Sequence, residues 1–440
     1  MPRSGVNAPG LDEYRNLRRD LERAIVSLAT SVDGRRFTFQ ASLHELAFQA
    51  GGYVVLEDGI ERRLGQVITL ESASSEGPAL AVSLGDDLSA QNRLVLRYAQ
   101  GEGVVLEGDG APFHDAVARP AEPDEVRAWL ERTQPRRASL AIGDLLLAPG
   151  VAFALDAGGF DRHTFLCGQS GSGKTYSLGL VLEQLLLETD LRILILDPNS
   201  DFVGLGTVRP GADEGLASRY VDVAQAVSVR TRADAGIPLQ LAFPELDSAA
   251  QAALLRLDPI SDREEYAVLV AALDEWRPST LLDLVKEGGV DERKLWERRS
   301  DRRPVLVVID EAHSVCPQEP EDALTALATE HAVRIAGEGR KFGLYLLIST
   351  QRPQKVHENV LSQCDNLLLM RMNSTADLGF VGDVFSFVPQ SLLERATTFR
   401  QGESLAAGKF SPHPALLRFG ARVSEEGGGD VPTDWAAERS

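Results

Sequence analysis

The chain has 440 residues, of which 43% are hydrophobic and 25% are charged, and its formal net charge is −20. These values are typical of a folded globular protein of two or three domains. The strong acidity argues against a chain that coats nucleic acid with its whole surface. It leaves room for a local basic channel, because charges in solution act over a Debye length of roughly 8–10 Å.

The sequence also shows no clear sign of a membrane span, a signal peptide, a disulfide framework or a cysteine metal site. No apolar run reaches the ~20 residues that a membrane span needs, and the first residues lack the layout of a signal peptide. The three cysteines, Cys167, Cys316 and Cys364, lie too far apart to indicate a disulfide framework or a metal site. We therefore expect a cytoplasmic protein with no membrane association.

The first predicted element is an amphipathic helix over residues 11–30, with Leu17, Leu21 and Leu28 on one stripe. It forms most of an N-terminal extension that we assign to residues 1–36. A helix that packs on its own domain is the favoured interpretation, and a helix that docks a partner is the alternative.

From residue 37 to residue 110 the hydrophobic pattern becomes strand-like. Short apolar runs there are separated by Gly, Asp, Asn and Ser, which predicts a small antiparallel β-barrel. The barrel shows no titratable constellation, so we interpret it as a binding or assembly module. A linker with one charged helix, over 122–132, is expected at 111–140. The runs that indicate barrel strands are 53–56, 65–70, 80–84 and 93–98.

The motif G-x-x-x-x-G-K-T spans Gly168–Thr175, between an apolar run and a helical run. Strand, glycine-rich turn and helix start form the context that a phosphate-binding loop requires. Lys174 would reach the β- and γ-phosphates of ATP, and the Thr175 hydroxyl would bind Mg²⁺. Loop N–H groups and the helix dipole would add positive charge. The residues expected to contact ATP are Gly168, Gln169, Ser170, Gly171, Ser172, Gly173, Lys174, Thr175 and Tyr176.

A second motif ends the apolar run at residues 304–309 with Asp310 and Glu311, as in a Walker B strand. Asp310 would hold the water shell of Mg²⁺, and Glu311 would polarise the attacking water. A buried strand that ends in a solvated acidic turn is the alternative. The phosphate-binding loop upstream favours the Walker B interpretation.

Further apolar runs at 192–196, 344–350 and 367–371 alternate with helical stretches. This alternation predicts an α/β core over 141–410 with a doubly wound, mostly parallel sheet. A largely helical insertion is expected at about 203–300 and a C-terminal tail at 411–440. The strand ends should bring together the loop, Asp197, Asp310, Glu311 and Gln351.

These motifs resemble those of the HerA family of the HerA/FtsK P-loop ATPases. The resemblance extends over nearly the whole chain from about residue 37. One departure is Asn199-Ser200-Asp201 after Asp197-Pro198, where that family usually has a His-Gly-Glu-type sequence. The stretches that carry the resemblance are Gly168–Thr175, Ile195–Pro198, Val307–His313, Glu338–Gly343, Ile348–Pro353 and Val360–Asn366 with Arg371.

The resemblance implies a RecA-like core, a homo-hexameric ring, ATP hydrolysis between subunits with Mg²⁺, and translocation of duplex DNA. Archaeal members work with a NurA-type nuclease in DNA end resection, which implies such a partner here. Arg340 would be the arginine finger that reaches a neighbour's γ-phosphate, with Lys341 and Arg352 as rivals. Gln351 would sense that phosphate, and Asp197 would lie at the nucleotide pocket. For Arg340, a cation that complements a helix dipole is the alternative.

Other functions remain compatible with the motifs. Asp310-Glu311-Ala312-His313 also spells the box of two-domain helicases, but too little chain follows Pro353 for a second RecA-like domain. An ATPase that powers conjugative DNA transfer or secretion is one alternative. A non-translocating ATP-dependent scaffold in a defence system is another. We expect a DNA-processing motor.

Overall fold

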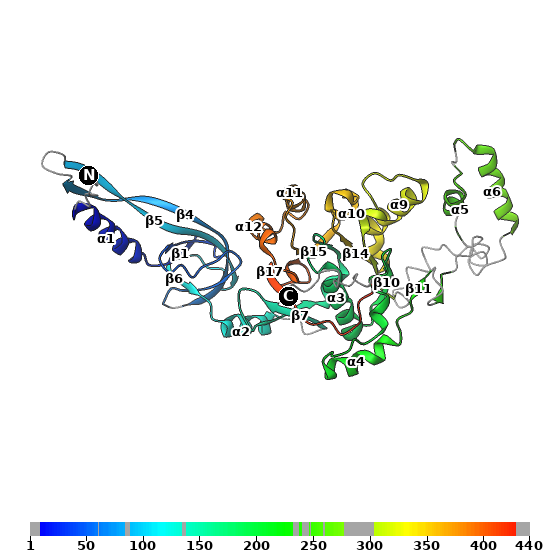
Figure 1. The fold of residues 1–440 in the computed structure, drawn as a ribbon, viewed down its shortest axis with the longest axis horizontal. Helices are drawn as coiled ribbons and strands as arrows, with labels where there is room; N and C mark the ends of the chain where they lie inside the picture. The colour runs from blue at the N-terminus through cyan, green and yellow to red at the C-terminus, as the bar shows by residue number, and fades with distance from the viewer. Residues whose placement is uncertain are drawn as a thin grey trace, which may run out of the picture. The chain divides into compact units, whose positions relative to one another are not determined.

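The computed structural model describes residues 9–59, 61–83, 89–133, 138–231, 237–239, 246, 248–257, 260–276 and 303–427. The chain divides into two compact units (Figure 1). One unit contains a β-barrel, and the other contains the sheet that carries the phosphate-binding loop.

The barrel is closed, with strand order β1-β2-β5-β4-β3-β6 and antiparallel pairing. Alternate residues of β2 point inward, so Phe37 and Phe39 lie in the barrel core. Gly103 and Gly101 on β5 leave space for them, because a Cβ at either glycine would lie 2.2 Å from the ring opposite. The strands are β1 (Leu28–Ser31), β2 (Arg36–Ser42), β3 (Tyr53–Glu57), β4 (Arg62–Ser83), β5 (Ser89–Glu107) and β6 (Phe113–Pro120).

Several predicted bounds differ from the structure: the barrel includes β1 and β6, which lie outside the predicted range 37–110, and a core strand at Ala415–Phe419 lies within the predicted tail. The N-terminal helix, α1 (Pro9–Arg23), ends before Leu28, which instead begins β1. The predicted strands 65–70 and 80–84 belong to one long strand, β4, paired with β5 in an extended hairpin. Gly77 and Pro78 fall where the register shifts between Glu76 and Ala79. They therefore mark a β-bulge in a continuous strand and not a turn between two strands.

The second unit is built on a nine-stranded sheet of order β10-β13-β14-β9-β15-β16-β17-β7-β8. The five strands from β10 to β15 in this order are parallel. This α/β arrangement confirms the predicted doubly wound, mostly parallel sheet. The parallel strands are β9 (His163–Cys167), β10 (Arg192–Leu196), β13 (Val305–Ile309), β14 (Leu344–Thr350) and β15 (Cys364–Met370).

Two hairpins extend the sheet beyond β15, and the sequence patterns did not reveal them as parts of it. β15 pairs antiparallel with β16, and β16 pairs antiparallel with β17. β7 and β8 form a second antiparallel pair at the far edge. These strands are β7 (Ser139–Leu145), β8 (Ala152–Asp156), β16 (Glu403–Gly408) and β17 (Ala415–Phe419).

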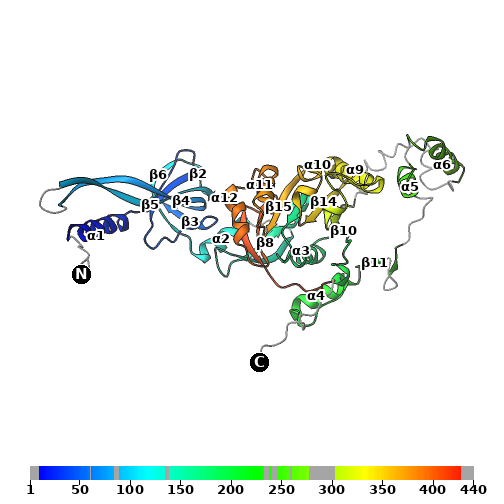
Figure 2. The ribbon, with the colours of Figure 1, turned by 45° about the horizontal axis from the view of Figure 1, so that its top comes forward.

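Helices cover both faces of the sheet: Figures 1 and 2 show α3 and α4 on one side and α9, α10 and α11 on the other. The insertion between β10 and β13 contains α4, a short strand pair (β11, Arg230–Thr231; β12, Ile237–Pro238), α5 and α6. The helices are α2 (Pro123–Thr133), α3 (Lys174–Glu188), α4 (Glu214–Ala224), α5 (Ser248–Leu255), α6 (Arg263–Trp276), α9 (Ala323–Glu338), α10 (Glu358–Leu361), α11 (Thr375–Val384) and α12 (Gln390–Leu393).

Parts of two predicted segments lie outside the described residues. These are residues 277–300 of the predicted helical insertion and residues 428–440 of the predicted tail. Within the described part of the chain, the helices are too short or too polar to cross a membrane.

Candidate active site

The loop between β9 and α3 has the backbone geometry that its glycines allow. Gly171 and Gly173 adopt φ values of 71° and 92°, in the left-handed region that favours glycine. A Cβ at Gly168 would lie 2.7 Å from the Met370 side chain. α3 begins at Lys174, directly after the loop. The loop N–H groups and the positive end of the α3 dipole therefore lie together, as an anion site requires.

Lys174 is the buried cation of this site, with 8% of its surface exposed. Its Nζ donates to Asp310 Oδ1 at 2.7 Å and to Ser349 Oγ at 3.0 Å, and it lies 3.4 Å from Glu311 Oε1. These contacts fix the position of the ammonium group beside the loop. A triphosphate would compete with these acceptors for the same proton donors.

The parallel register explains why residues far apart in sequence meet at one edge of the sheet. Leu196 pairs with Ile309, Ile309 with Ile348, and Thr350 with Cys167. All four strands therefore end within two residues of the same level. The residues that follow these ends are Asp197, Asp310 with Glu311, Gln351, and the phosphate-binding loop.

Glu311 occupies a strained position at this edge, with φ 46° and ψ 47°, which a non-glycine residue rarely adopts. Gln351 Nε2 donates to Glu311 Oε1 at 3.2 Å, and His313 Nδ1 lies 3.2 Å from Glu311 Oε2. Burial lowers the pKa of His313. Strain of this kind persists where the surroundings fix a residue, often at a functional site. Gln351 thus holds one oxygen of the carboxylate, whereas Oε2 lies near His313 without a hydrogen-bond partner among the described residues.

Three carboxylates gather beside Lys174. Oxygen atoms of Asp197, Asp201 and Asp310 lie within 4.8 Å of one another. Asp197 accepts hydrogen bonds from the backbone N–H groups of Asp201 and Phe202, at 3.0 and 2.9 Å. Burial raises the pKa of Asp201, and the nearby Asp310 and Asp197 raise it further. Asp310 Oδ2 is buried with no hydrogen-bond partner among the described residues.

This donor set consists only of oxygen atoms, which suits a hard cation such as Mg²⁺. The orphaned Asp310 oxygen is the observation that fits a bound cation best, because an unpartnered buried carboxylate oxygen is costly. Thr175, the residue expected to add a hydroxyl ligand, lies half-buried in the first turn of α3.

The structure does not bring Arg340 to this edge. Arg340 lies after α9 and before β14, at the opposite edge of the sheet. β14 is seven residues long, and a strand of that length spans about 23 Å. Lys341 lies beside Arg340, whereas Arg352 follows β14 at the edge with the loop. Of the three candidate fingers, Arg352 is therefore the one near the site of its own chain.

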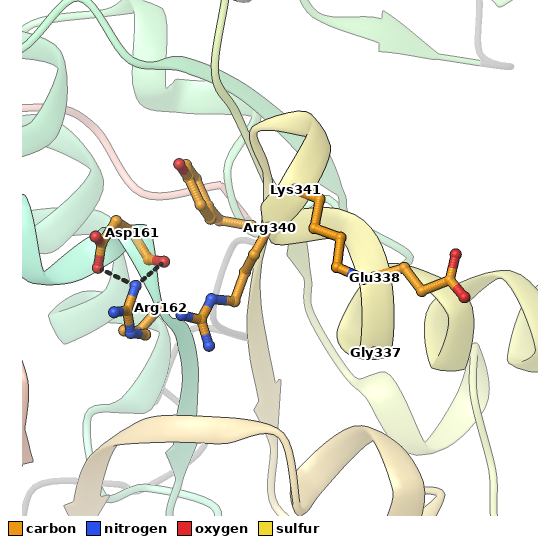
Figure 3. Close-up of a pocket in the computed structure, with 7 residues that line it drawn as sticks. Asp161, Arg162, Gly337, Glu338, Arg340 and Lys341 are labelled. Carbon is orange, nitrogen blue, oxygen red and sulfur yellow. Dashed lines mark hydrogen bonds and ion pairs between the residues drawn. The ribbon is translucent and has the colours of Figure 1, made fainter. Parts of the chain in front are cut away.

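Arg340 lines a hollow of about 390 Å³ together with Arg162, Lys341 and Tyr345 (Figure 3). Its side chain is 45% exposed, and its Nη1 lies 3.8 Å from Asp365 Oδ2. Arg162 pairs with Asp161 at 2.9 Å, as the dashed lines of Figure 3 show. The hollow thus has mixed charge, with Asp161 and Glu338 beside its three cations, and lies at the sheet edge opposite the phosphate-binding loop.

Sequence reasoning missed four residues that contact the site. Ser349 precedes Gln351 by two positions, so the strand period could have placed both on one face. Arg371 Nη2 donates to the Gly171 carbonyl oxygen at 3.0 Å, and the Arg371 carbonyl accepts from Gln169 N at 2.9 Å. The other two are His313 and Asp201. The strained turn at Glu311 brings His313 beside that carboxylate, and Asp201 lies partly buried beside Asp197 and Asp310.

The sheet order places β14, which Gln351 directly follows, between the loop strand and the Walker B strand. A P-loop, a Walker B carboxylate pair and this RecA-like order define the class: the chain is a P-loop ATPase. Residues 140–310 match the family described as "Helicase HerA, central domain". The match covers less than half of the chain, and there the chain is similar to the HerA central domain, in agreement with the resemblance that the motifs indicate.

Relatives agree with this family. The chain is 25% identical over 459 aligned residues to the "DNA double-strand break repair helicase HerA" of Saccharolobus solfataricus, covering 86% of this chain and 89% of the relative. It is 28% identical over 183 residues to the "Probable helicase MJ1565" of Methanocaldococcus jannaschii, covering 40% of this chain. The chain spans only 35% of the length of that second relative.

A solved structure of similar kind is VirB4 of Thermoanaerobacter pseudethanolicus. It is 12% identical and has a TM-score of 0.42, and the match covers 66% of this chain and 98% of that one.

Proposed function

We propose that this protein is an ATP-hydrolysing ring motor that translocates duplex DNA during DNA processing. The observation that carries the ATPase part is the buried cluster around Lys174, which contacts Asp310, Ser349 and Glu311. ATP would bind with its phosphates at residues 168–175. Lys174 would then exchange its carboxylate contacts for the β- and γ-phosphates.

The chain's own residues have distinct roles in this proposal. Glu311 orients the attacking water and accepts its proton, and Gln351 holds the carboxylate in position through the 3.2 Å hydrogen bond. Asp310 and Thr175 hold Mg²⁺, with Asp197 nearby. When bound, Mg²⁺ neutralises charge on the phosphate oxygens.

The proposed assembly depends on the finger role of Arg340. Because this residue lies about 23 Å from the loop edge of its own sheet, it could act as a finger only at a neighbouring subunit's site. This requirement supports an oligomer with sites between subunits, and we propose a homo-hexameric ring from the family resemblance. The exposed guanidinium suits such a contact.

The DNA part of the proposal rests on kinship. The Saccharolobus solfataricus relative, which aligns with most of this chain, is named as a DNA double-strand break repair helicase. The same kinship supports a NurA-type nuclease as partner. The net charge of −20 requires that DNA meet a local basic surface and not the whole molecule.

Duplex DNA is expected to stimulate ATP hydrolysis, and binding should weaken steeply as salt rises, because phosphate contacts release counterions. Sequence preference should be slight, since backbone contacts carry no base information. Hydrolysis rates with and without duplex DNA, and affinities at several salt concentrations, measure this. Lys174→Ala provides the background rate. If wild type shows neither stimulation nor binding at ~50 mM salt, the scaffold alternative replaces the motor.

A further inference from the structure

A short segment after β17, residues 422–427, lies between the phosphate-binding helix α3 and the loop that follows β10. We call these six residues the C-terminal strap. Figure 2 shows this part of the chain, in red, passing from the sheet toward α4. No catalytic motif lies in the strap, yet its contacts reach elements on two sides of the ATP site.

The strap is anchored to α3 by a fully buried ion pair. Arg422 and Glu183 are both 0% exposed, and Arg422 Nε donates to Glu183 Oε1 at 3.1 Å. Glu183 also accepts from the backbone N–H groups of Val423 and Ser424, at 2.8 and 2.7 Å, and from the Ser424 hydroxyl. A carboxylate with this many donors is well satisfied, so this contact is specific and costly to break.

Two further residues on the same face of α3 contact Arg422. Its backbone N–H donates to Tyr176 Oη at 2.8 Å. A Cβ at Gly179 would lie 2.3 Å from the Arg422 guanidinium carbon, so only glycine leaves the space that this side chain fills. Tyr176, Gly179 and Glu183 are spaced by three and four residues and share one helix face. The strap therefore holds α3 along two turns, beginning two residues after Lys174.

The other end of the strap contacts the loop that carries Asp201. Gly427 N donates to the Asp201 carbonyl oxygen at 3.0 Å, and Glu425 N donates to the Thr207 carbonyl oxygen at 2.9 Å. A Cβ at Gly427 would lie 2.1 Å from the Ser200 carbonyl oxygen. Ser200 itself has a φ of 66°, in the left-handed region. The strap thus packs directly against the turn that points Asp201 toward Asp310.

α4 supports the same arrangement from the side. Val423 packs with Tyr220 and Ala224 in an apolar cluster. Tyr220 Oη donates to the Leu205 carbonyl oxygen at 2.7 Å. The loop after β10 is therefore held by both the strap and α4.

From these contacts we propose that the C-terminal strap fixes the loop of Asp197 and Asp201 against α3, and that Arg422 and Glu183 are positioning residues for ATP hydrolysis. α3 carries Lys174 and Thr175, and the loop carries the carboxylates beside Asp310. Hydrolysis needs these two groups in one geometry, and a displacement of about 1 Å can cost up to 10²-fold in rate. The proposal rests on the ATPase activity proposed above and is independent of DNA.

Two variants test the strap at its two ends. Glu183→Gln keeps the shape of the side chain and leaves Arg422 without its buried counter-charge. Gly427→Ala leaves the ion pair intact and pushes on Ser200, so it remains informative where Glu183→Gln folds poorly. Arg219→Met is the matched control, because the exposed Arg219 of α4 pairs with Glu188, which lies on α3 as Glu183 does.

Both test variants are expected to lower kcat about tenfold while the KM for ATP changes less. Hydrogen exchange should become faster at residues 198–208 in both, with little change in the barrel strands. Arg219→Met should match wild type in both measurements. Hydrogen exchange can be measured without ATP hydrolysis. An inactive wild type would therefore count against the proposed ATPase, while the exchange at residues 198–208 would still test the role of the strap.

Two results would overturn the strap's role. One is an unchanged kcat per folded molecule in both variants. The other is exchange that rises evenly across the sheet and barrel, which would indicate a general loss of stability and no specific effect on the loop.

Discussion

Glu311→Gln is expected to bind ATP with nearly wild-type affinity and to hydrolyse it about 10²–10⁴-fold more slowly. An amide has the shape of the carboxylate but cannot accept the proton of the attacking water. The hydrogen bond from Gln351 can hold either side chain in position, so binding should be spared. Single-turnover hydrolysis and equilibrium ATP binding, measured on the same preparation, separate the two effects.

The matched control is Glu330→Gln, which removes an exposed carboxylate on α9 and should leave hydrolysis unchanged. Lys174→Ala should differ from both, because it removes the cation that faces the phosphates and should lose ATP binding itself. Turnover above about a tenth of wild type in Glu311→Gln, compared with the 10²-fold loss expected of a missing general base, would contradict the assignment.

The parallel core could be predicted from sequence because its signals are local. Gly171 and Gly173 adopt left-handed φ values, which glycine tolerates best. The glycines of the motif therefore follow from the backbone conformation of the loop itself, and the sequence alone reveals them. The run before Asp310 is apolar because both faces of β13 are covered. Once these strands are known to be parallel, their register forces Asp197, Asp310 and Gln351 to one edge.

Other features could not be predicted because they depend on distant contacts. The long β4–β5 hairpin contains a Gly-Pro pair that normally indicates a turn, and only cross-strand pairing shows that it forms a bulge. β16 and β17 lack a distinctive period, since both are largely buried within the sheet. Arg422 and Glu183 are 239 residues apart, and no local pattern marks either residue as a partner of the other.

The roles of individual site residues stay predictions, and the position of Arg340 makes its role the sharpest to test. A finger supplied by a neighbour contributes ~10³–10⁵ in rate, because it meets charge that builds only in the transition state. Arg340→Ala should therefore bind ATP almost normally and hydrolyse it very slowly. Arg334→Ala removes another exposed arginine, on α9, and is the control that should stay active.

Mixing two inactive variants tests whether the finger acts between subunits. In a ring that contains both Arg340→Ala and Glu311→Gln chains, some interfaces join an intact Glu311 to a neighbour's intact Arg340. These interfaces have every catalytic part, so the mixture should recover part of the wild-type rate once subunit exchange is confirmed. The ATPase rate of the mixture, compared with each variant alone, is the measurement.

A mixture that stays inactive has two explanations, and titration of wild type with Arg340→Ala distinguishes them. Steep loss of activity at a low fraction of the variant would show that the ring needs all its sites in sequence, with Arg340 still acting in trans. Loss in simple proportion to the variant would show that each chain depends on its own Arg340. That second result would remove Arg340 as a finger in trans, and its effect would have to be indirect, because Arg340 and the phosphate-binding loop lie at opposite edges of one sheet. Arg352, the rival at the loop edge, would then be the next variant to test.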